Sequence, residues 1–212
     1  MKSDKATYLK QLRAHITETR SFFGPKMKPE RERSVCRAFV RCLGVAFNEP
    51  EIIASTTEPV DVEFRTAKFQ IRELLDPGRK RGDELKQTQQ KYENATSIED
   101  LATPYELSRP WSVKHLGAEV TKGLQEKAEK YGNECQNLDA LVYADLQNQH
   151  LDAKSIFPDV TTLEAQGWRS VSVIFAPCSV VLHANAKAPD FLQRHAGQVL
   201  SCSEEWDSLF DP

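Results

Sequence analysis

The chain has 212 residues and a formal net charge of −3, with 40% hydrophobic and 28% charged residues. This composition supports a hydrophobic core and excludes a chain that is disordered throughout, while nine glycines without a fixed repeat exclude a collagen-like or repeat protein. No stretch approaches the roughly 20 apolar residues of a membrane span, and the opening MKSDKATYLKQLR lacks a signal-peptide core, so we expect a cytoplasmic protein without a membrane partner.

The first third of the chain predicts two helices and three strands. Residues 3–22 suit a short amphipathic helix that ends before Gly24–Pro25. Residues 30–47 carry apolar side chains at helical spacing, which predicts a helix with one buried stripe. Strand-like pieces follow at 51–55, 59–65 and 68–75, and Asp76–Pro77–Gly78 is a stop signal.

The stretch EPVDVEFRTAKFQIREL, residues 58–74, alternates apolar and polar side chains with a period of two. Alternation of this kind predicts two half-buried strands. A hairpin turning at Thr66–Ala67 would pair Phe64 with Phe69, Glu63 with Gln70 and Asp61 with Arg72. One face of the hairpin would then be apolar, and the other would be either a solvated sheet surface or a functional site.

The remainder predicts a polar arm followed by further sheet strands. Residues 79–112 are rich in charge and amides, so we expect an insertion or arm with an exposed helix near 82–93. The other predicted elements are a helix at 112–131, strands at 138–147, 168–177 and 179–185, a helix at 188–198 and a short acidic tail at 201–212. Length and element order predict one domain over 1–212, of α/β class, with helices on a mixed sheet.

Two basic patches stand out against the small acidic excess. They comprise Lys26, Lys28, Arg31 and Arg33, and the run Arg79, Lys80 and Arg81. Such patches are either solvated faces or contacts to nucleic-acid phosphates, since local charge determines phosphate affinity. The five cysteines lack CxxC spacing, and we expect reduced thiols in the cytoplasm.

The hairpin acids suggest a divalent cation. Asp61 and Glu63 lie two residues apart on one strand face, and Mg²⁺ often binds one or two carboxylates together with waters and a substrate phosphate. Glu32 precedes Val35 by three residues, so it shares the buried stripe of its helix and points toward the sheet. A cation there would stabilise charge on a phosphate or activate water.

The order of these elements resembles the pattern of the PD-(D/E)xK nuclease superfamily. That pattern consists of a helix with an acid, a strand ending in Pro-Asp and a strand with acid-x-Lys. The segment FVRCLGVAFNEPEIIASTTEPVDVEFRTAKFQIREL is also similar to a bacterial family of unknown function whose description names an endonuclease. The resemblance implies a restriction-endonuclease-like sheet flanked by helices, with Asp61 as the metal-binding aspartate and Glu32 as the helix acid. Gln70 and Arg72 would occupy the acid and lysine positions.

Two substitutions depart from that pattern. Gln70 is neutral where an acid is expected, although its carbonyl oxygen can bind a hard cation, and Glu63 could supply the missing charge as a further ligand. Arg72 cannot serve as a base, but it can clamp a phosphate. The leading hypothesis is therefore a Mg²⁺- or Mn²⁺-dependent endonuclease that hydrolyses DNA, with an altered or weakened site, and that could act as a homodimer.

Two other functions remain open. The same fold could serve as a non-catalytic module that binds nucleic acid or a protein. A thiol enzyme built on Cys178 with His183 or His195 is a third option, against which a buried strand cysteine is the common alternative.

Overall fold

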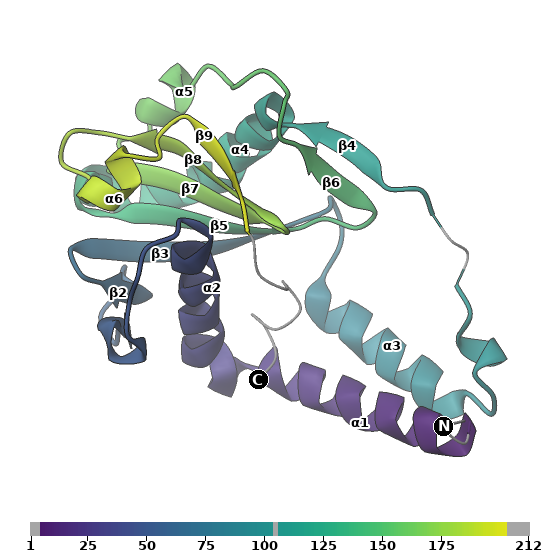
Figure 1. Ribbon diagram of the computed structural model, residues 1–212. Helices are drawn as coiled ribbons and strands as arrows, with labels where there is room; N and C mark the ends of the chain where they lie inside the picture. The colour runs from purple at the N-terminus through teal and green to yellow at the C-terminus, as the bar shows by residue number, and fades with distance from the viewer. Residues whose placement is uncertain (1–4, 104–105, 203–212) are drawn as a thin grey trace. The chain divides into compact units, whose positions relative to one another are not determined.

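The computed structural model describes residues 5–103 and 106–202 (Figure 1). Contacts divide the chain into two compact units. The helical unit comprises the residues up to 31 together with 77–107, and the sheet unit comprises residues 32–76 and those from 108 on. The predicted acidic tail lies outside the described residues beyond position 202.

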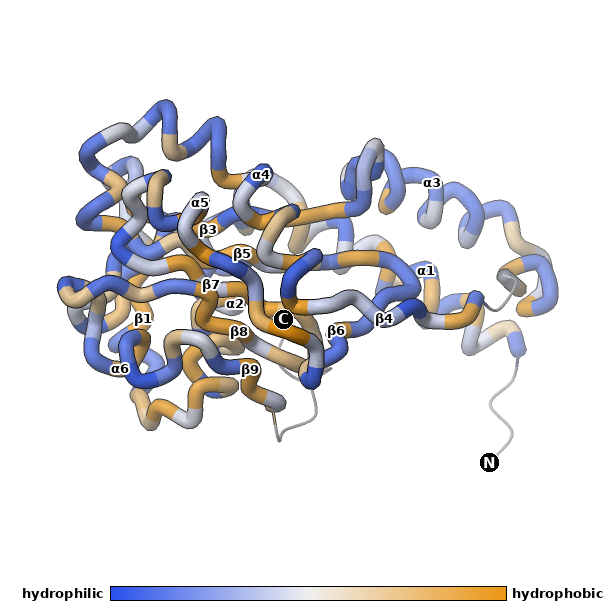
Figure 2. The backbone as a smooth tube through the Cα atoms, turned by 90° about the horizontal axis from the view of Figure 1, so that it is seen from above, coloured by the Kyte–Doolittle hydropathy of each residue, from blue (hydrophilic) through white to orange (hydrophobic). Residues whose placement is uncertain are grey.

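The helical unit is built from two long helices. These are α1 (Lys5–Phe22) and α3 (Arg81–Asn94), accompanied by the short turns η1 (Pro25–Met27) and η3 (Glu99–Leu101). Arg13 on α1 donates hydrogen bonds to the carbonyls of Tyr92 and Ala95, at 2.9 and 2.8 Å. The predictions of helices near 3–22 and 82–93 are confirmed, and Figure 2 shows that α3 is mostly hydrophilic.

The sheet unit contains a seven-stranded mixed sheet in the order β1-β2-β3-β5-β7-β8-β9. Its strands are β1 (Ile52–Ala54), β2 (Val62–Phe64), β3 (Ala67–Leu75), β5 (Asp139–Asp145), β7 (Ser170–Phe175), β8 (Cys178–Ala184) and β9 (Gln198–Ser201). Strands β3, β5 and β7 are parallel, and the pairs toward both edges are antiparallel. The predicted α/β class with helices flanking a mixed sheet is confirmed at this level.

Two helices cover opposite faces of this sheet (Figure 1). One core cluster joins α2 (Lys28–Cys42) to Phe69 and Leu141, and the other joins α4 (Val113–Tyr131) to Ala140 and Val142. Since neighbouring residues of a strand face opposite sides, Phe69 and Gln70 belong to different faces. This distinction decides which side chains can meet at the hairpin.

The remaining elements are short. They are η2 (Glu49–Glu51), η4 (Gly132–Asn137), α5 (Thr161–Glu164), α6 (Asp190–Gln193) and the parallel two-stranded ribbon of β4 (Arg109–Ser112) and β6 (Gln149–Asp152). The ribbon was not predicted, because Arg109–Ser112 has no alternating apolar pattern.

Two predicted helices end earlier than expected. α2 stops at Cys42 rather than near 47, because Gly44 takes a positive φ of 66° that terminates the helix. The predicted helix at 188–198 is only the one-turn α6, and Gly197 with φ 77° leads into the edge strand β9. A positive φ in both places breaks a pattern that hydrophobic spacing alone would continue.

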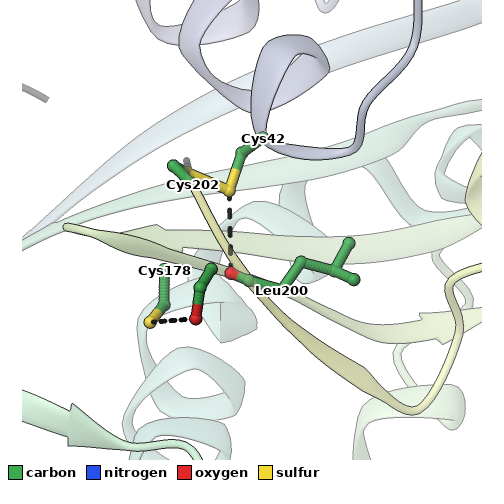
Figure 3. Close-up of a disulfide and its surroundings, with 5 residues drawn as sticks. Cys42, Cys178, Leu200 and Cys202 are labelled. Carbon is green, nitrogen blue, oxygen red and sulfur yellow. Dashed lines mark hydrogen bonds between the residues drawn. A yellow bond between two sulfur atoms is a disulfide. The ribbon is translucent and has the colours of Figure 1, made fainter. Parts of the chain in front are cut away.

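A disulfide joins the end of α2 to the residue that follows β9 (Figure 3). Cys42 and Cys202 are bonded with a Cα–Cα distance of 4.6 Å, although 160 positions separate them. The expectation of reduced thiols is therefore wrong for this pair, because folding places two distant cysteines side by side. Cys36, Cys135 and Cys178 are free and buried.

None of the helices in the described ranges is both long enough and apolar enough to span a bilayer.

Candidate functional site

The hairpin of β2 and β3 pairs two residues away from the predicted register. Val62 lies opposite Phe69, Glu63 opposite Lys68 and Phe64 opposite Ala67. The predicted pairing of Phe64 with Phe69, Glu63 with Gln70 and Asp61 with Arg72 is therefore wrong. The physical reason is an earlier turn at Arg65–Thr66, where Arg65 adopts a positive φ of 53°.

Contacts of the Arg65 side chain hold this turn. Its Nε donates to Glu51 Oε2 at 2.9 Å and its Nη2 donates to the Ala46 carbonyl at 2.6 Å. The guanidinium also lies 4.9 Å from the centroid of the Phe64 ring. These contacts offset the strain of a left-handed arginine and fix the register.

The observed register places Asp61 beside Gln70. Asp61 Oδ2 accepts two hydrogen bonds of 2.8 Å, from Gln70 Nε2 and from the Ile71 backbone N–H. Gln70 Nε2 also donates to the Ile71 carbonyl, at 3.3 Å. One amide nitrogen thus lies between a carboxylate oxygen and a carbonyl oxygen, at the margin where β2 leaves β3.

The amide of Gln70 has one unsatisfied atom. The residue is only 3% exposed, and Gln70 Oε1 is buried without a hydrogen-bond partner in the described part of the chain. Rotating the amide by half a turn would put Oε1 near Asp61 Oδ2 and the Ile71 carbonyl, at the cost of the two hydrogen bonds that Nε2 donates. Three oxygens would then face one point, which is a donor set that a hard cation accepts.

Within the described ranges, no three histidine, cysteine, aspartate or glutamate side chains come together to hold a metal ion. The set at Asp61 differs from such a cluster because two of its three donors are an amide and a backbone carbonyl. Mg²⁺ commonly retains several waters, so few protein ligands are sufficient. The residues present therefore fit a weakly held hard cation with a largely hydrated shell.

The structure places the other predicted ligands differently. Glu63 and Arg72 are exposed and, by strand alternation, share the face of Gln70. Glu32 is 9% exposed on α2, which packs on the face that carries Phe69. The prediction that Glu32 converges with Asp61 and Gln70 is therefore wrong, because the sheet lies between Glu32 and the other two residues.

A buried ion pair lies beneath the hairpin, and the sequence analysis missed it. Asp139 is fully buried at the start of β5, and both of its oxygens accept bonds from the Arg169 guanidinium. Its Oδ1 also accepts from Ser170 Oγ at 2.7 Å, and its Oδ2 from the Lys68 backbone N–H at 2.9 Å. An acid opening the apolar run LDALVYADL was the available signal, since a buried charge needs partners.

Most residues of the predicted basic patches already have partners. Arg31 donates to the Phe22 carbonyl at 3.0 Å, and Arg33 donates to the Ile52 carbonyl at 3.0 Å. Arg79 binds both carboxylate oxygens of Glu84 through Nε and Nη2, at 2.9 and 3.1 Å. These guanidiniums already make hydrogen bonds or ion pairs within the protein. A phosphate contact would therefore use only the donors that these bonds leave over.

The two patches meet within the helical unit at an aromatic ring. The guanidinium carbons of Arg31 and Arg81 lie 5.5 and 4.3 Å from the centroid of Phe23. Lys26, Lys28 and Lys80, their near neighbours in sequence, are exposed. Two guanidiniums about 50 positions apart in sequence thereby lie at one ring, and clustered positive charge favours phosphate binding.

The first pair of the third option, a thiol enzyme with Cys178 and His183, is not assembled. Cys178 and His183 both lie on β8, five residues apart, which is about 16 Å along a strand. His183 Nδ1 lies 3.3 Å from Glu164 Oε1, and burial lowers its pKa despite that carboxylate. Burial also raises the pKa of the Cys36 thiol to about 12, which leaves it protonated and unreactive.

Comparison with known proteins identifies a family for nearly the whole chain. The family described as "Putative endonuclease, protein of unknown function (DUF1780)" matches residues 4–207. A solved structure from Pseudomonas aeruginosa strain PAO1, described as a protein of unknown function of the Monooxygenase Superfamily, is similar with a TM-score of 0.66 and 26% identity. The alignment covers 94% of this chain and 96% of that one. No protein with a curated description matches.

Proposed function

The chain belongs to the DUF1780 family of putative endonucleases, and from that premise we propose that it is a divalent-cation-dependent nuclease that hydrolyses DNA phosphodiester bonds. We also propose that the observed mixed sheet has the restriction-endonuclease-like fold. The observation that carries the proposal is the contact of Gln70 Nε2 with both Asp61 Oδ2 and the Ile71 carbonyl. In the PD-(D/E)xK pattern, the acid and the acid-x-Lys strand stand at these positions.

The order of the elements supports the assignment. Helix α2 bears Glu32, β2 follows Pro59 and Asp61, and β3 carries Gln70 and Arg72. The order agrees with the helix acid, Pro-Asp and acid-x-Lys positions of the resemblance, although Val60 separates Pro59 from Asp61 and both residues precede β2 instead of ending a strand. The site differs in its chemistry, because an amide and a guanidinium replace the acid and the lysine.

Each residue of the candidate site would have a separate role in the reaction. Asp61, the rotated amide of Gln70 and the Ile71 carbonyl would hold Mg²⁺ or Mn²⁺, which when bound supplies positive charge to the scissile phosphate and to an attacking water. Arg72, exposed on the same face, binds the phosphate in a two-pronged grip. Glu63 is exposed two residues from Asp61 and would accept the proton that the attacking water loses.

One observation favours a second function. Gln70 Nε2 already stands where a cation would lie, and its two N–H groups satisfy both oxygens. A protein whose amide permanently occupies this position would bind nucleic acid or a protein without cleaving it. Gln70 therefore separates the two functions experimentally.

The test combines plasmid nicking with calorimetric titration of Mn²⁺. Wild type, Asp61→Asn and Gln70→Glu are compared, with Asp83→Asn as the matched control, because Asp83 is an exposed aspartate of the helical unit. We expect Asp61→Asn to lose both nicking and Mn²⁺ binding, Asp83→Asn to retain them, and Gln70→Glu to bind Mn²⁺ more tightly because it adds a carboxylate ligand.

Equal nicking by wild type and Asp61→Asn would refute the nuclease assignment at this site. Wild type that neither nicks nor binds Mn²⁺, alongside a Gln70→Glu variant that gains Mn²⁺ binding, would establish the non-catalytic function. A nuclease-active wild type whose activity is lost on mutation of Glu32 but not of Asp61 would move the site to the other face of the sheet.

A further inference from the structure

A stacked pair of aromatic rings lies beside the two-stranded ribbon of the sheet unit. The indole of Trp111, on β4, and the imidazole of His115, in the first turn of α4, have centroids 4.3 Å apart and planes 10° apart. The indole also meets Phe175 edge-on at 6.3 Å, which connects it to the core. Ser112 caps the helix by accepting from the His115 N–H at 3.1 Å. The ring pair is therefore fixed before any ligand arrives.

The outer ring of this pair is accessible. His115 is exposed, whereas Trp111 is half-buried, so the imidazole covers the indole and turns its second face to solvent. A third flat group could stack on that face and extend the array. Stacking of nucleobases on aromatic and histidine rings is the usual way in which proteins bind unpaired nucleotides.

Two cations flank the ring pair along the chain, and one acid, Glu119, lies four residues after His115 on the same face of α4. Between Ser108 and His115 the sequence contains Arg109 and Lys114 but no acidic residue. Arg109 lies two positions before Trp111 on the same strand, so both side chains share one face of the ribbon. Both cations are exposed, and neither has an ion-pair partner in the described part of the chain. They are available for phosphates.

We propose that the surface formed by Arg109, Trp111, Lys114 and His115, called here the stacking surface, binds single-stranded nucleic acid. An unpaired base would stack on His115, and the flanking phosphates would contact Arg109 and Lys114. A duplex cannot use this surface in the same way, because its base faces are covered by neighbouring bases. The inference rests on the proposed function in one respect, that the partner is nucleic acid, and it specifies a substrate with unpaired nucleotides.

Fluorescence anisotropy with the full chain tests the proposal. Labelled oligo(dT) and a labelled blunt duplex are titrated in the presence of EDTA, so that neither cleavage nor a cation contributes. We expect wild type to prefer oligo(dT), and His115→Ala to weaken oligo(dT) binding by about five-fold or more, which is the loss of one stacked base. His115→Phe keeps a flat ring and should retain binding.

Matched variants separate stacking from charge. Lys114→Gln should weaken binding and reduce its dependence on salt, whereas Lys122→Gln, an exposed position on the same helix, should not. His15→Ala on α1 is the control for His115→Ala. Quenching of indole fluorescence by oligo(dT), measured in a Trp206→Phe background and lost on the further change Trp111→Phe, gives an independent readout, since the remaining Trp168 is buried.

The outcomes distinguish this inference from the nuclease proposal. If oligo(dT) binds at the stacking surface but no variant nicks DNA, the inference stands and the nuclease proposal fails. If nicking requires Asp61 but His115→Ala binds oligo(dT) as wild type does, the stacking surface is refuted and the nuclease proposal stands. Absence of oligo(dT) binding by wild type, or a preference for the duplex, also overturns the inference.

Discussion

Reduction of the Cys42–Cys202 disulfide should lower the stability of the chain by a large and calculable amount. The bond closes a loop with a sequence separation of 160, and it connects α2 to the strand β9 at the edge of the sheet. Closing a loop of that length removes about 5 kcal/mol of denatured-state entropy at 25 °C in the chain-entropy account. For a chain of this size, that corresponds to a shift in Tm of about 10–20 °C.

The assay is thermal unfolding followed by circular dichroism, with and without a phosphine reductant. Wild type is compared with Cys42→Ser and Cys202→Ser. Reductant should lower the Tm of wild type to that of the variants and leave the variants unchanged. In the absence of reductant, alkylation under denaturing conditions should label three of the five cysteines, because Cys36, Cys135 and Cys178 are free.

A wild-type Tm that does not respond to reductant, or five alkylated cysteines in unreduced protein, would refute this reasoning. Either result would mean that the two thiols are neighbours without a bond. A Tm that falls equally in wild type and in both variants would instead show that the reductant acts elsewhere.

Three further predictions concern stability. Asp139→Asn should cost about 3–5 kcal/mol in urea unfolding, because it leaves the Arg169 guanidinium without its buried countercharge. Phe39→Ala should cost about 3–5 kcal/mol in the same measurement, since the ring is fully buried between α2 and the sheet. Burial lowers the pKa of His183, so the unfolded chain takes up a proton below about pH 6.5 while the folded chain resists it. Stability should therefore fall as pH drops below that value, and His183→Gln should flatten that part of the pH profile.

The fold was largely predictable because its long elements carry strong periodic patterns. The apolar stripe of α2 and the continuous apolar run of β5 reflect their burial in the core, so both are visible in the sequence. The two helices of the helical unit are also delimited by the sequence. The short ribbon of β4 and β6 has no such pattern, because only one of its strands contributes a buried residue, Leu151. Elements of this kind form through tertiary contacts that a local pattern does not record.

The candidate site was predictable in its residues but not in its geometry. Alternation correctly put Asp61 and Gln70 on the hairpin, yet their contact depends on the register, and one left-handed residue, Arg65, shifts the register by two positions. Helical spacing likewise assigns Glu32 to a helix face without saying which side of the sheet that helix covers. The connection between the helix and the strands decides that. It places α2 on the face of the sheet that does not carry Gln70.

The partners of Gln70 determine how tightly this site can bind a cation. To expose Oε1, the amide must give up a 2.8 Å hydrogen bond to a carboxylate and a 3.3 Å bond to a carbonyl. Bonds of these two kinds contribute about 1.5–3 and 0.5–1.5 kcal/mol. Cation affinity should therefore be about 30- to 2000-fold lower than for the same oxygens without the amide contacts. A glutamate at position 70 has no N–H groups to surrender, and its charge repels Asp61 until a cation binds. The substitution thus removes the amide N–H groups that compete with a cation, and it adds a negative charge that a cation would neutralise. For this reason, Gln70→Glu tests whether the site can bind a cation more directly than the loss of Asp61 does.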